Sequence, residues 1–217
     1  MSWTRATWLT FLMFVPLWAG AELPAKARAF QEGSHFETLP NPVASSDGKL
    51  EVIEFFWYGC PHCYRIEPYV KQWQASVGPD VRVVRMPGVL NANWSLLARA
   101  YYAAESLGVL DKVHEPFFQV IHDQGRRLGS EDAVLQVVNA VGVDGVAFRE
   151  AMRSMGVESK VRRSIELGND LQLSGVPALI VAGKYRVLNA GAANYQEMFQ
   201  IVDYLLERER QATKPAG

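Results

Sequence analysis

Runs of hydrophobic residues predict where the sheet and the first helices of this chain lie. A nearly continuous apolar run at 50–58 indicates a buried strand, since a strand covered on both faces is apolar almost throughout. Residues 81–86 are predicted to form a second core strand, which Pro87-Gly88 closes. A short edge strand is expected at 35–39, where prolines follow. Apolar residues with a period of 3.6 predict helices at 60–77 and 94–107.

After residue 90 the pattern changes to one helix after another. Helices are expected at 111–122 with an interruption near Pro116, at 130–142 and at 144–156. The elements expected after these are a helix at 159–173, strands at 178–181 and 185–188 joined by a glycine-assisted turn, and a last helix capped by Asn194 and Glu197. The chain is therefore predicted to be α/β, with a central mixed sheet built from 22–89 (βαβ) and 158–217 (αββα) and an inserted all-helical domain at 90–157.

The first 21 residues resemble an export signal. Arg5 supplies positive charge, an apolar stretch begins at Trp8, and 19–21 (Ala-Gly-Ala) offers a small-residue cleavage site before Glu22. An uncleaved membrane anchor is the alternative, although Pro16 breaks the run and leaves it short for a span. A cleaved signal implies an oxidising compartment, in which thiols can form and exchange disulfides.

Charge and composition narrow the partners. The chain has 49% hydrophobic residues, enough for a full core, and a formal net charge of −1. Loss of residues 1–21 would remove one cation and no acid, giving about −2. Such a balance argues against nucleic acid as a partner and against a polybasic membrane patch.

The only two cysteines of the chain lie together in Cys60-Pro61-His62-Cys63. The loop between them is too small for a disulfide there to stabilise the fold appreciably, and two sulfurs are too few for a structural zinc site. The pair follows a predicted buried strand and a glycine turn and opens a predicted helix, which is the thioredoxin-like redox context. A metal site and chance spacing remain the alternatives.

Each residue of the motif has a predicted chemical use. Cys60, at the helix start, is the candidate nucleophile, because the helix dipole and free N–H groups there stabilise a thiolate. Cys63 is the candidate resolving thiol. His62 can stabilise the thiolate further, unless it is only a solvent-exposed residue, and Pro61 presets the helical φ.

Four further residues are candidates from their positions. Val176-Pro177 precedes a strand that should lie opposite the cysteines, where a cis bond would expose the Val176 backbone to an extended substrate; a plain strand-start proline is the alternative. Glu54 is a lone acid in an apolar strand, so it is either a buried acid with a raised pKa that relays protons for Cys63 or a residue that reaches solvent. Glu67 could modulate the local field, but a solvated helix face is the simpler explanation.

Other histidines and tryptophans give weaker signals. His35, His114 and His122 show no metal-ligand spacing, so no metal site is expected. The tryptophans Trp57, Trp73 and Trp94 suit core or groove packing better than a cofactor site.

Residues 55–64 (FFWYGCPHCY) resemble the active-site segment of the DsbA-type periplasmic thiol:disulfide oxidoreductases. Residues 175–178 and 181–185 are similar to the cis-proline loop and hairpin of that family, and the likeness covers essentially all of the chain after the leader. The chain departs from the family at Gly59, where other members often carry a bulkier apolar residue, which affects partner preference.

The resemblance implies a thioredoxin-like fold with a helical insertion and a protein disulfide oxidase. It implies that Cys60 is the nucleophile, Cys63 the buried partner and His62 the main thiolate stabiliser, with Val176-Pro177 docking the substrate. Glu54 and Glu67 match the acids near the family's active site. The implied partners are reduced, unfolded exported proteins and a DsbB-like, quinone-linked membrane reoxidant, and no cofactor is implied besides the redox-active disulfide.

Two other functions stay open at this point. One is a disulfide isomerase or reductase, although isomerases usually need a dimerisation module and no segment here could form one, so a monomer is expected. The other is a non-catalytic thiol- or metal-binding or chaperone module, which would keep free or metal-blocked thiols.

Overall fold

The computed structural model describes residues 30–43, 45 and 49–213, so the predicted leader at 1–21 lies outside the described residues. The helices and strands, in chain order, are β1 (Phe36–Thr38), β2 (Leu50–Phe56), α1 (Pro61–Ser76), β3 (Val81–Pro87), η1 (Ala92–Trp94), α2 (Ser95–Ser106), α3 (Leu110–His122), α4 (Glu131–Ala140), α5 (Gly145–Met152), α6 (Met155–Asp170), β4 (Ala178–Val181), β5 (Tyr185–Val187), η2 (Asn189–Gly191) and α7 (Tyr195–Thr213). No helix among these residues is long and apolar enough to cross a membrane.

The five strands form one mixed sheet in the order β1-β5-β4-β2-β3. Strands β2 and β3 are parallel, while β4 runs antiparallel to β2, and β5 antiparallel to β4 and β1. The side chains of β2, which lies between β4 and β3, alternate between the two faces of the sheet. Val52 packs in a core with residues of α1 and α7, whereas Ile53 and Phe55 pack with Leu171 beyond the end of α6.

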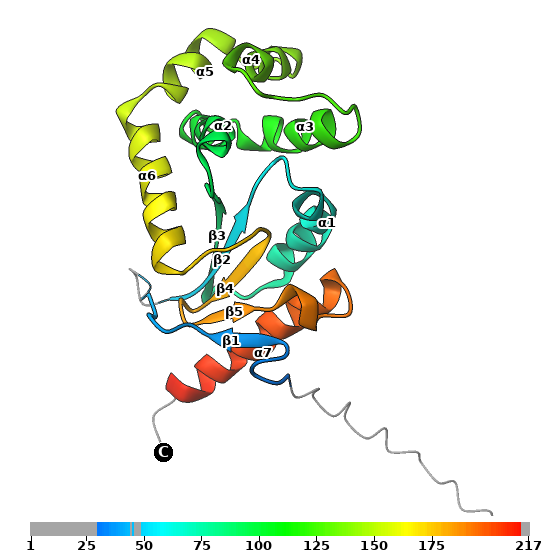
Figure 1. The fold of residues 1–217 in the computed structure, drawn as a ribbon, viewed down its shortest axis with the longest axis vertical. Coiled ribbons are helices and arrows are strands. Elements are labelled where there is room, and N and C mark those ends of the chain that lie inside the picture. The colour runs from blue at the N-terminus through cyan, green and yellow to red at the C-terminus, as the bar shows by residue number, and fades with distance from the viewer. Residues whose placement is uncertain (1–29, 44, 46–48, 214–217) are drawn as a thin grey trace, which may run out of the picture.

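The inserted helices lie at one end of the sheet. Figure 1 shows α2 to α5 gathered beyond the ends of β2 and β3, with α6 running back along the sheet toward β4. This helical end has its own core, which also includes Phe56, Tyr58, Cys60 and Cys63. The cysteines therefore lie at the junction between the sheet and the insert.

Most predicted elements are confirmed, and some of their boundaries differ. β2 ends at Phe56 rather than at residue 58, because residues 57–59 turn the chain toward α1. The helix capped by Asp144 ends at Met152 rather than near 156. A new helix starts there because the Ser154 hydroxyl accepts a hydrogen bond from Val157 N (3.3 Å).

The inserted helices differ from the prediction in two ways. The predicted boundary between 157 and 158 falls inside α6, which therefore joins the insert to the sheet as one continuous helix. The interruption expected near Pro116 is absent, since α3 is helical from Leu110 to His122. Buried neighbours such as Val113 and Phe117 hold this helix against the core despite the lost backbone donor.

The predicted helix cap and hairpin are also present. Asn194 Oδ1 accepts a hydrogen bond from Glu197 N (2.9 Å), and the Glu197 carboxylate accepts one from Ala193 N. In the turn between β4 and β5, Ala182 and Gly183 both have positive φ (53° and 62°), a conformation that favours glycine.

Candidate redox-active site

Cys60 lies at the point where the sheet ends and α1 begins. It is the N-cap of α1 with extended backbone (φ −89°, ψ 118°), and Pro61 takes the first helical turn. Cys60 N donates to Trp57 O (3.0 Å), which closes the turn after β2. The Cys60 sulfur therefore sits at the positive end of a 16-residue helix, as the sequence predicted.

The two thiols are free and lie in contrasting environments. Cys63 is fully buried, while Cys60 is 8% exposed. Cys60 is therefore less exposed than the sequence predicted for the nucleophile. A hydrogen bond from the Cys63 thiol, with further hydrogen bonds from the backbone of Cys63 and His62 and the charge of His62, lowers the pKa of Cys60 to about 6. Burial raises the pKa of Cys63 far above its usual range. The arrangement favours Cys60 as the thiolate and Cys63 as the proton-bearing partner.

The loop before β4 faces this thiol, as predicted. The Val176-Pro177 bond is cis, and the Cys60 thiol lies 3.4 Å from the Val176 carbonyl oxygen, which can accept its hydrogen bond. Asn189 Nδ2 donates to Pro177 O (2.8 Å) and so ties the loop to η2. The backbone of Val176 is thus next to the reactive sulfur, where an extended client chain could pair with it.

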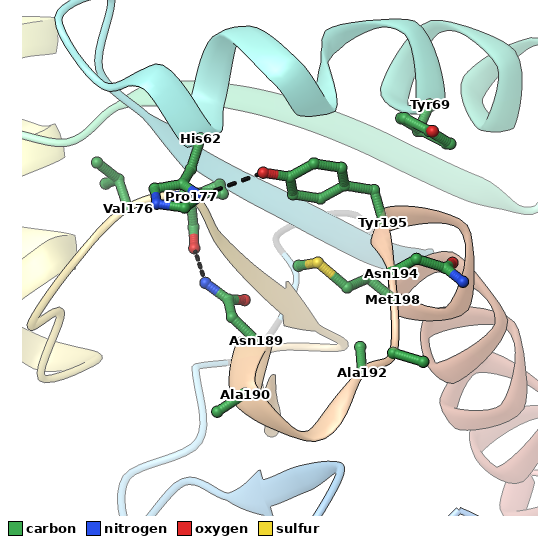
Figure 2. Close-up of a pocket in the computed structure, with 11 residues that line it drawn as sticks. His62, Tyr69, Val176, Pro177, Asn189, Ala190, Ala192, Asn194, Tyr195 and Met198 are labelled. Carbon is green, nitrogen blue, oxygen red and sulfur yellow. Dashed lines mark hydrogen bonds between the residues drawn. The ribbon is translucent and has the colours of Figure 1, made fainter.

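A groove of about 510 Å³ opens beside the loop and His62. Figure 2 shows it between the start of α1, the Val176-Pro177 loop and the start of α7. The residues that line it are His62, Tyr69, Val176, Pro177, Asn189, Ala190, Ala192, Ala193, Asn194, Tyr195 and Met198. Small and apolar side chains make up most of this list, so the groove suits a peptide segment better than a charged small molecule.

Glu54 and Glu67 are both buried, so the solvent-reaching alternatives for them are wrong. Glu54 is 1% exposed and Glu67 7%. Arg85 of β3 binds both carboxylates, with Nε donating to Glu54 Oε2 (2.7 Å) and Nη1 to Glu67 Oε2 (3.0 Å). His114 Nε2 lies 2.9 Å from Arg85 Nη1 and 3.3 Å from Glu67 Oε2. We call Glu54, Glu67, Arg85 and His114 the buried ion cluster.

Burial and the shared cation set the pKa values of this cluster. Burial raises the pKa of Glu54 despite the opposing charge of Arg85. For Glu67, burial is outweighed by hydrogen bonds from His114 and by the Arg85 charge, which together lower its pKa. Burial also lowers the pKa of His114. One carboxyl oxygen, Glu54 Oε1, is buried with no hydrogen-bond partner, so Glu54 is the acid of the cluster that can take up a proton.

Trp57 fills the space that Gly59 leaves. A Cβ added at Gly59 would lie 2.4 Å from two atoms of the Trp57 ring. The same ring stacks on Trp94 of η1, with centroids 4.2 Å apart and planes 3° apart. An indole from the preceding turn therefore takes the place of the bulky side chain that the family often carries at residue 59, and the effect on partner preference stays a prediction.

Sequence reasoning missed four residues of this region: Tyr58, Arg85, His114 and Tyr195. Tyr58 OH lies 2.8 Å from His114 Nδ1, and His62 Nδ1 lies 3.2 Å from Tyr195 OH. None of the four has a spacing that marks it, because their partners come from elements up to 133 residues away in the chain. The one available signal was the position of Arg85 in a predicted core strand, since it lies opposite Glu54 in the parallel neighbour β2.

Across the described ranges, no group of three or more histidine, cysteine or acidic side chains could hold a metal ion.

Comparisons with known proteins agree on one family. A family model described as a DSBA-like thioredoxin domain matches residues 51–204. The thiol:disulfide interchange protein DsbA of Azotobacter vinelandii is 36% identical over 181 residues, 83% of this chain and 85% of the relative. That of Pseudomonas aeruginosa is 34% identical over 193 residues, 88% of this chain and 92% of the relative.

Solved structures show the same likeness in three dimensions. The crystal structure of Pseudomonas aeruginosa DsbA aligns with a TM-score of 0.81 at 34% identity, over 84% of this chain and 96% of that one. The oxidoreductase DsbA from Xylella fastidiosa aligns with a TM-score of 0.77 at 29% identity, over 83% of this chain and 98% of that one. The chain belongs to the DSBA-like thioredoxin family, and with it to the DsbA-type thiol:disulfide oxidoreductases.

Proposed function

We propose that this protein is a periplasmic dithiol oxidase, which passes a disulfide between Cys60 and Cys63 to reduced, newly exported proteins. The observation that carries the proposal is the asymmetry of the pair. Cys60 has the lowered pKa and lies beside the Val176 carbonyl, while Cys63 is fully buried. A client thiolate can therefore reach only one of the two sulfurs.

The exchange takes two steps. A client thiolate attacks Cys60 Sγ, the Cys60–Cys63 bond breaks, and Cys63 leaves as a thiolate that takes up a proton. A second client thiolate then attacks the client sulfur of the mixed disulfide, and Cys60 leaves as a thiolate. The client is oxidised by two electrons, and the dithiol protein is reduced by the same two.

The surrounding residues suit these steps. The first turn of α1 and His62 stabilise the Cys60 thiolate as it leaves. Glu54, with its raised pKa and its unpartnered Oε1, is the acid we assign to protonating Cys63. Glu67 holds Arg85 and His114 next to Glu54, so its part is to set the field around that acid. The Val176-Pro177 loop and the groove beside it hold the client chain.

The paired variants Cys60→Ser and Cys63→Ala test the assignment of roles. Cys63→Ala should accumulate mixed disulfides with a reduced client through Cys60, because the resolving thiol is gone. Cys60→Ser should form none and lose oxidase activity. Non-reducing electrophoresis and mass spectrometry of the adducts would measure this, and adducts on Cys63 alone would reverse the roles.

An isomerase or reductase would differ from an oxidase in the reduction potential of its cysteine pair. An oxidase should give an equilibrium constant with glutathione that favours its dithiol form, whereas a reductase should favour its disulfide.

We also propose that the chain acts as a monomer and that a DsbB-like, quinone-linked membrane protein reoxidises it. Sedimentation of the mature protein, and reoxidation by membranes with and without quinone, test these two points.

Export is part of the same proposal. Family members carry the same kind of periplasmic role, and the leader at 1–21 would direct export with cleavage after Ala21. Mass spectrometry of the mature protein from a periplasmic extract should then give Glu22 as the first residue. A retained leader in the membrane fraction would favour the anchor instead.

A further inference from the structure

Two side chains, one from α1 and one from α7, meet on one nitrogen of His62. His62 Nδ1 lies 3.0 Å from Arg65 Nη2 and 3.2 Å from Tyr195 OH. Arg65 Nε in turn donates to Tyr195 OH (3.4 Å). Figure 2 shows Tyr195 reaching from the start of α7 across the groove toward His62. Arg65 follows His62 by three residues, so the two share one face of α1.

The two partners of this nitrogen suit different protonation states of the ring. A guanidinium only donates, so His62 Nδ1 can bond to Arg65 only when that nitrogen carries no proton. A phenol oxygen both donates and accepts, so Tyr195 OH can also receive a proton from Nδ1 when the ring is charged. Arg65 therefore favours a neutral His62, and Tyr195 is the one of the two that can support a charged His62.

The other charged and titratable groups near His62 do not change this balance. On α1 and its N-cap they are the two thiols and Tyr69, which is the remaining titratable side chain in the lining of the groove. No carboxylate belongs to the described lining of the groove, so an acid there does not compensate the charge of Arg65. His62 and Arg65 are both exposed, so water screens part of the effect.

We propose that Arg65 and Tyr195 are positioning residues that act on the Cys60 thiolate through His62, with opposite effects. Arg65, which can only donate, opposes a proton on Nδ1 and so works against the positive charge of the ring. Tyr195 offers the acceptor that a charged ring needs. The pair would thus adjust how strongly the family's cysteine motif oxidises in this chain, a refinement that rests on the proposed oxidase function.

Two single variants should move the Cys60 pKa in opposite directions. Arg65→Met should lower it, because His62 then gains charge next to the sulfur, and Arg65 itself is not among the main causes that set the Cys60 pKa. Tyr195→Phe should raise it, because the acceptor for a charged ring is gone. Each shift should be about 0.5, a small part of what a nearby charge does to a less exposed group. The glutathione equilibrium constant should change about threefold in each case.

The readout is the ultraviolet absorbance of the thiolate in the reduced protein over a pH series. Arg65→Lys, which keeps a donor-only cation, should restore the wild-type pKa. Matched controls are Arg162→Met on the exposed face of α6 and Tyr204→Phe, nine residues after Tyr195 on α7 and packed against Phe30 and Phe36. Both should leave the Cys60 pKa unchanged. Near-ultraviolet circular dichroism would check that each variant is folded.

The His62→Ala background decides between an indirect and a direct effect. Without the imidazole, Arg65→Met and Tyr195→Phe should shift the Cys60 pKa by less than about 0.2, within the error of such titrations. Shifts of the same sign, shifts that persist in the His62→Ala background, or no shift in the single variants would each overturn the proposal.

Oxidation of a reduced client by the wild-type protein is measured in parallel. Its failure would overturn the oxidase function while leaving the coupling measured at His62 intact.

Discussion

At the scale of single residues, the two cysteines differ mainly in their surroundings. The largest cause of the lowered Cys60 pKa is a hydrogen bond from the Cys63 thiol, and the contributions of the backbone and of His62 come after it. The buried thiol therefore has a use before it ever resolves a mixed disulfide: it stabilises the thiolate that its partner must become.

This order of causes predicts a difference between two substitutions of Cys63. Cys63→Ala removes the donor and should raise the Cys60 pKa from about 6 toward its ordinary value, by about one unit or more. Cys63→Ser keeps a hydroxyl donor at the same place and should raise it less. The pH dependence of alkylation by iodoacetamide measures both. Equal shifts in the two variants would show that the hydrogen bond from residue 63 does not set the pKa.

At the scale of secondary-structure elements, the turn between β2 and α1 depends on a glycine. Gly59→Ala would place a methyl group 2.4 Å from the Trp57 ring, so the indole must leave its stack on Trp94. We expect a loss of about 1–3 kcal/mol of unfolding free energy. Loss of the near-ultraviolet signal of the paired indoles should accompany it. Gly129→Ala is the matched control, because a Cβ there would have no neighbour within 4 Å.

The buried ion cluster joins four elements, β2, β3, α1 and α3, around one cation. Arg85→Met would leave two buried carboxylates without their shared partner, and we expect it to cost about 3–5 kcal/mol of unfolding free energy. Neutralising the acids as well, in the triple variant with Glu54→Gln and Glu67→Gln, should recover part of that loss. Urea unfolding would measure both proteins. A single variant as stable as the wild type would mean that the ion pairs contribute nothing net.

Local signals account for most of what the sequence could predict. Apolar periodicity, caps such as Ser130 and Asn194, and the glycine turn at Gly183 act within a few residues, and the helices and strands they predict are present. The redox motif was equally local. The buried ion cluster was not predictable, because Glu67 reads as a polar residue on a helix until Arg85 and His114, 18 and 47 residues away, cover it.

At the scale of the whole molecule, the state of two sulfur atoms should affect global stability. A dithiol oxidase, as proposed, needs an oxidising couple, and a thermodynamic cycle then requires the dithiol form to be the more stable one. The lowered Cys60 pKa supplies a physical source for that difference. Closing the disulfide removes the stabilised thiolate, while a loop of four residues returns little entropy.

The same linkage fixes how the difference in stability changes with pH. Because the Cys60 pKa is lower in the folded protein than the value of about 8.5 in an unfolded chain, ionisation of Cys60 adds stability that is fully present above about pH 8.5. That contribution falls with decreasing pH and is lost below about 6. After allowance for solvent around the sulfur, it amounts to about 1–2 kcal/mol. The reduced protein should therefore melt several degrees above the oxidised protein at neutral pH, with the gap narrowing toward pH 5.

Thermal melts of both redox forms over a pH series measure this gap. His62→Ala should narrow it at pH 7, because the imidazole is one of the groups that stabilise the Cys60 thiolate. Cys60→Ser, which has no thiolate at residue 60, is the control whose stability should lack this component of the pH dependence. An oxidised form that melts higher at pH 7 would contradict the prediction, because its disulfide would then stabilise the fold as a structural disulfide does, and the protein would hold that disulfide instead of donating it.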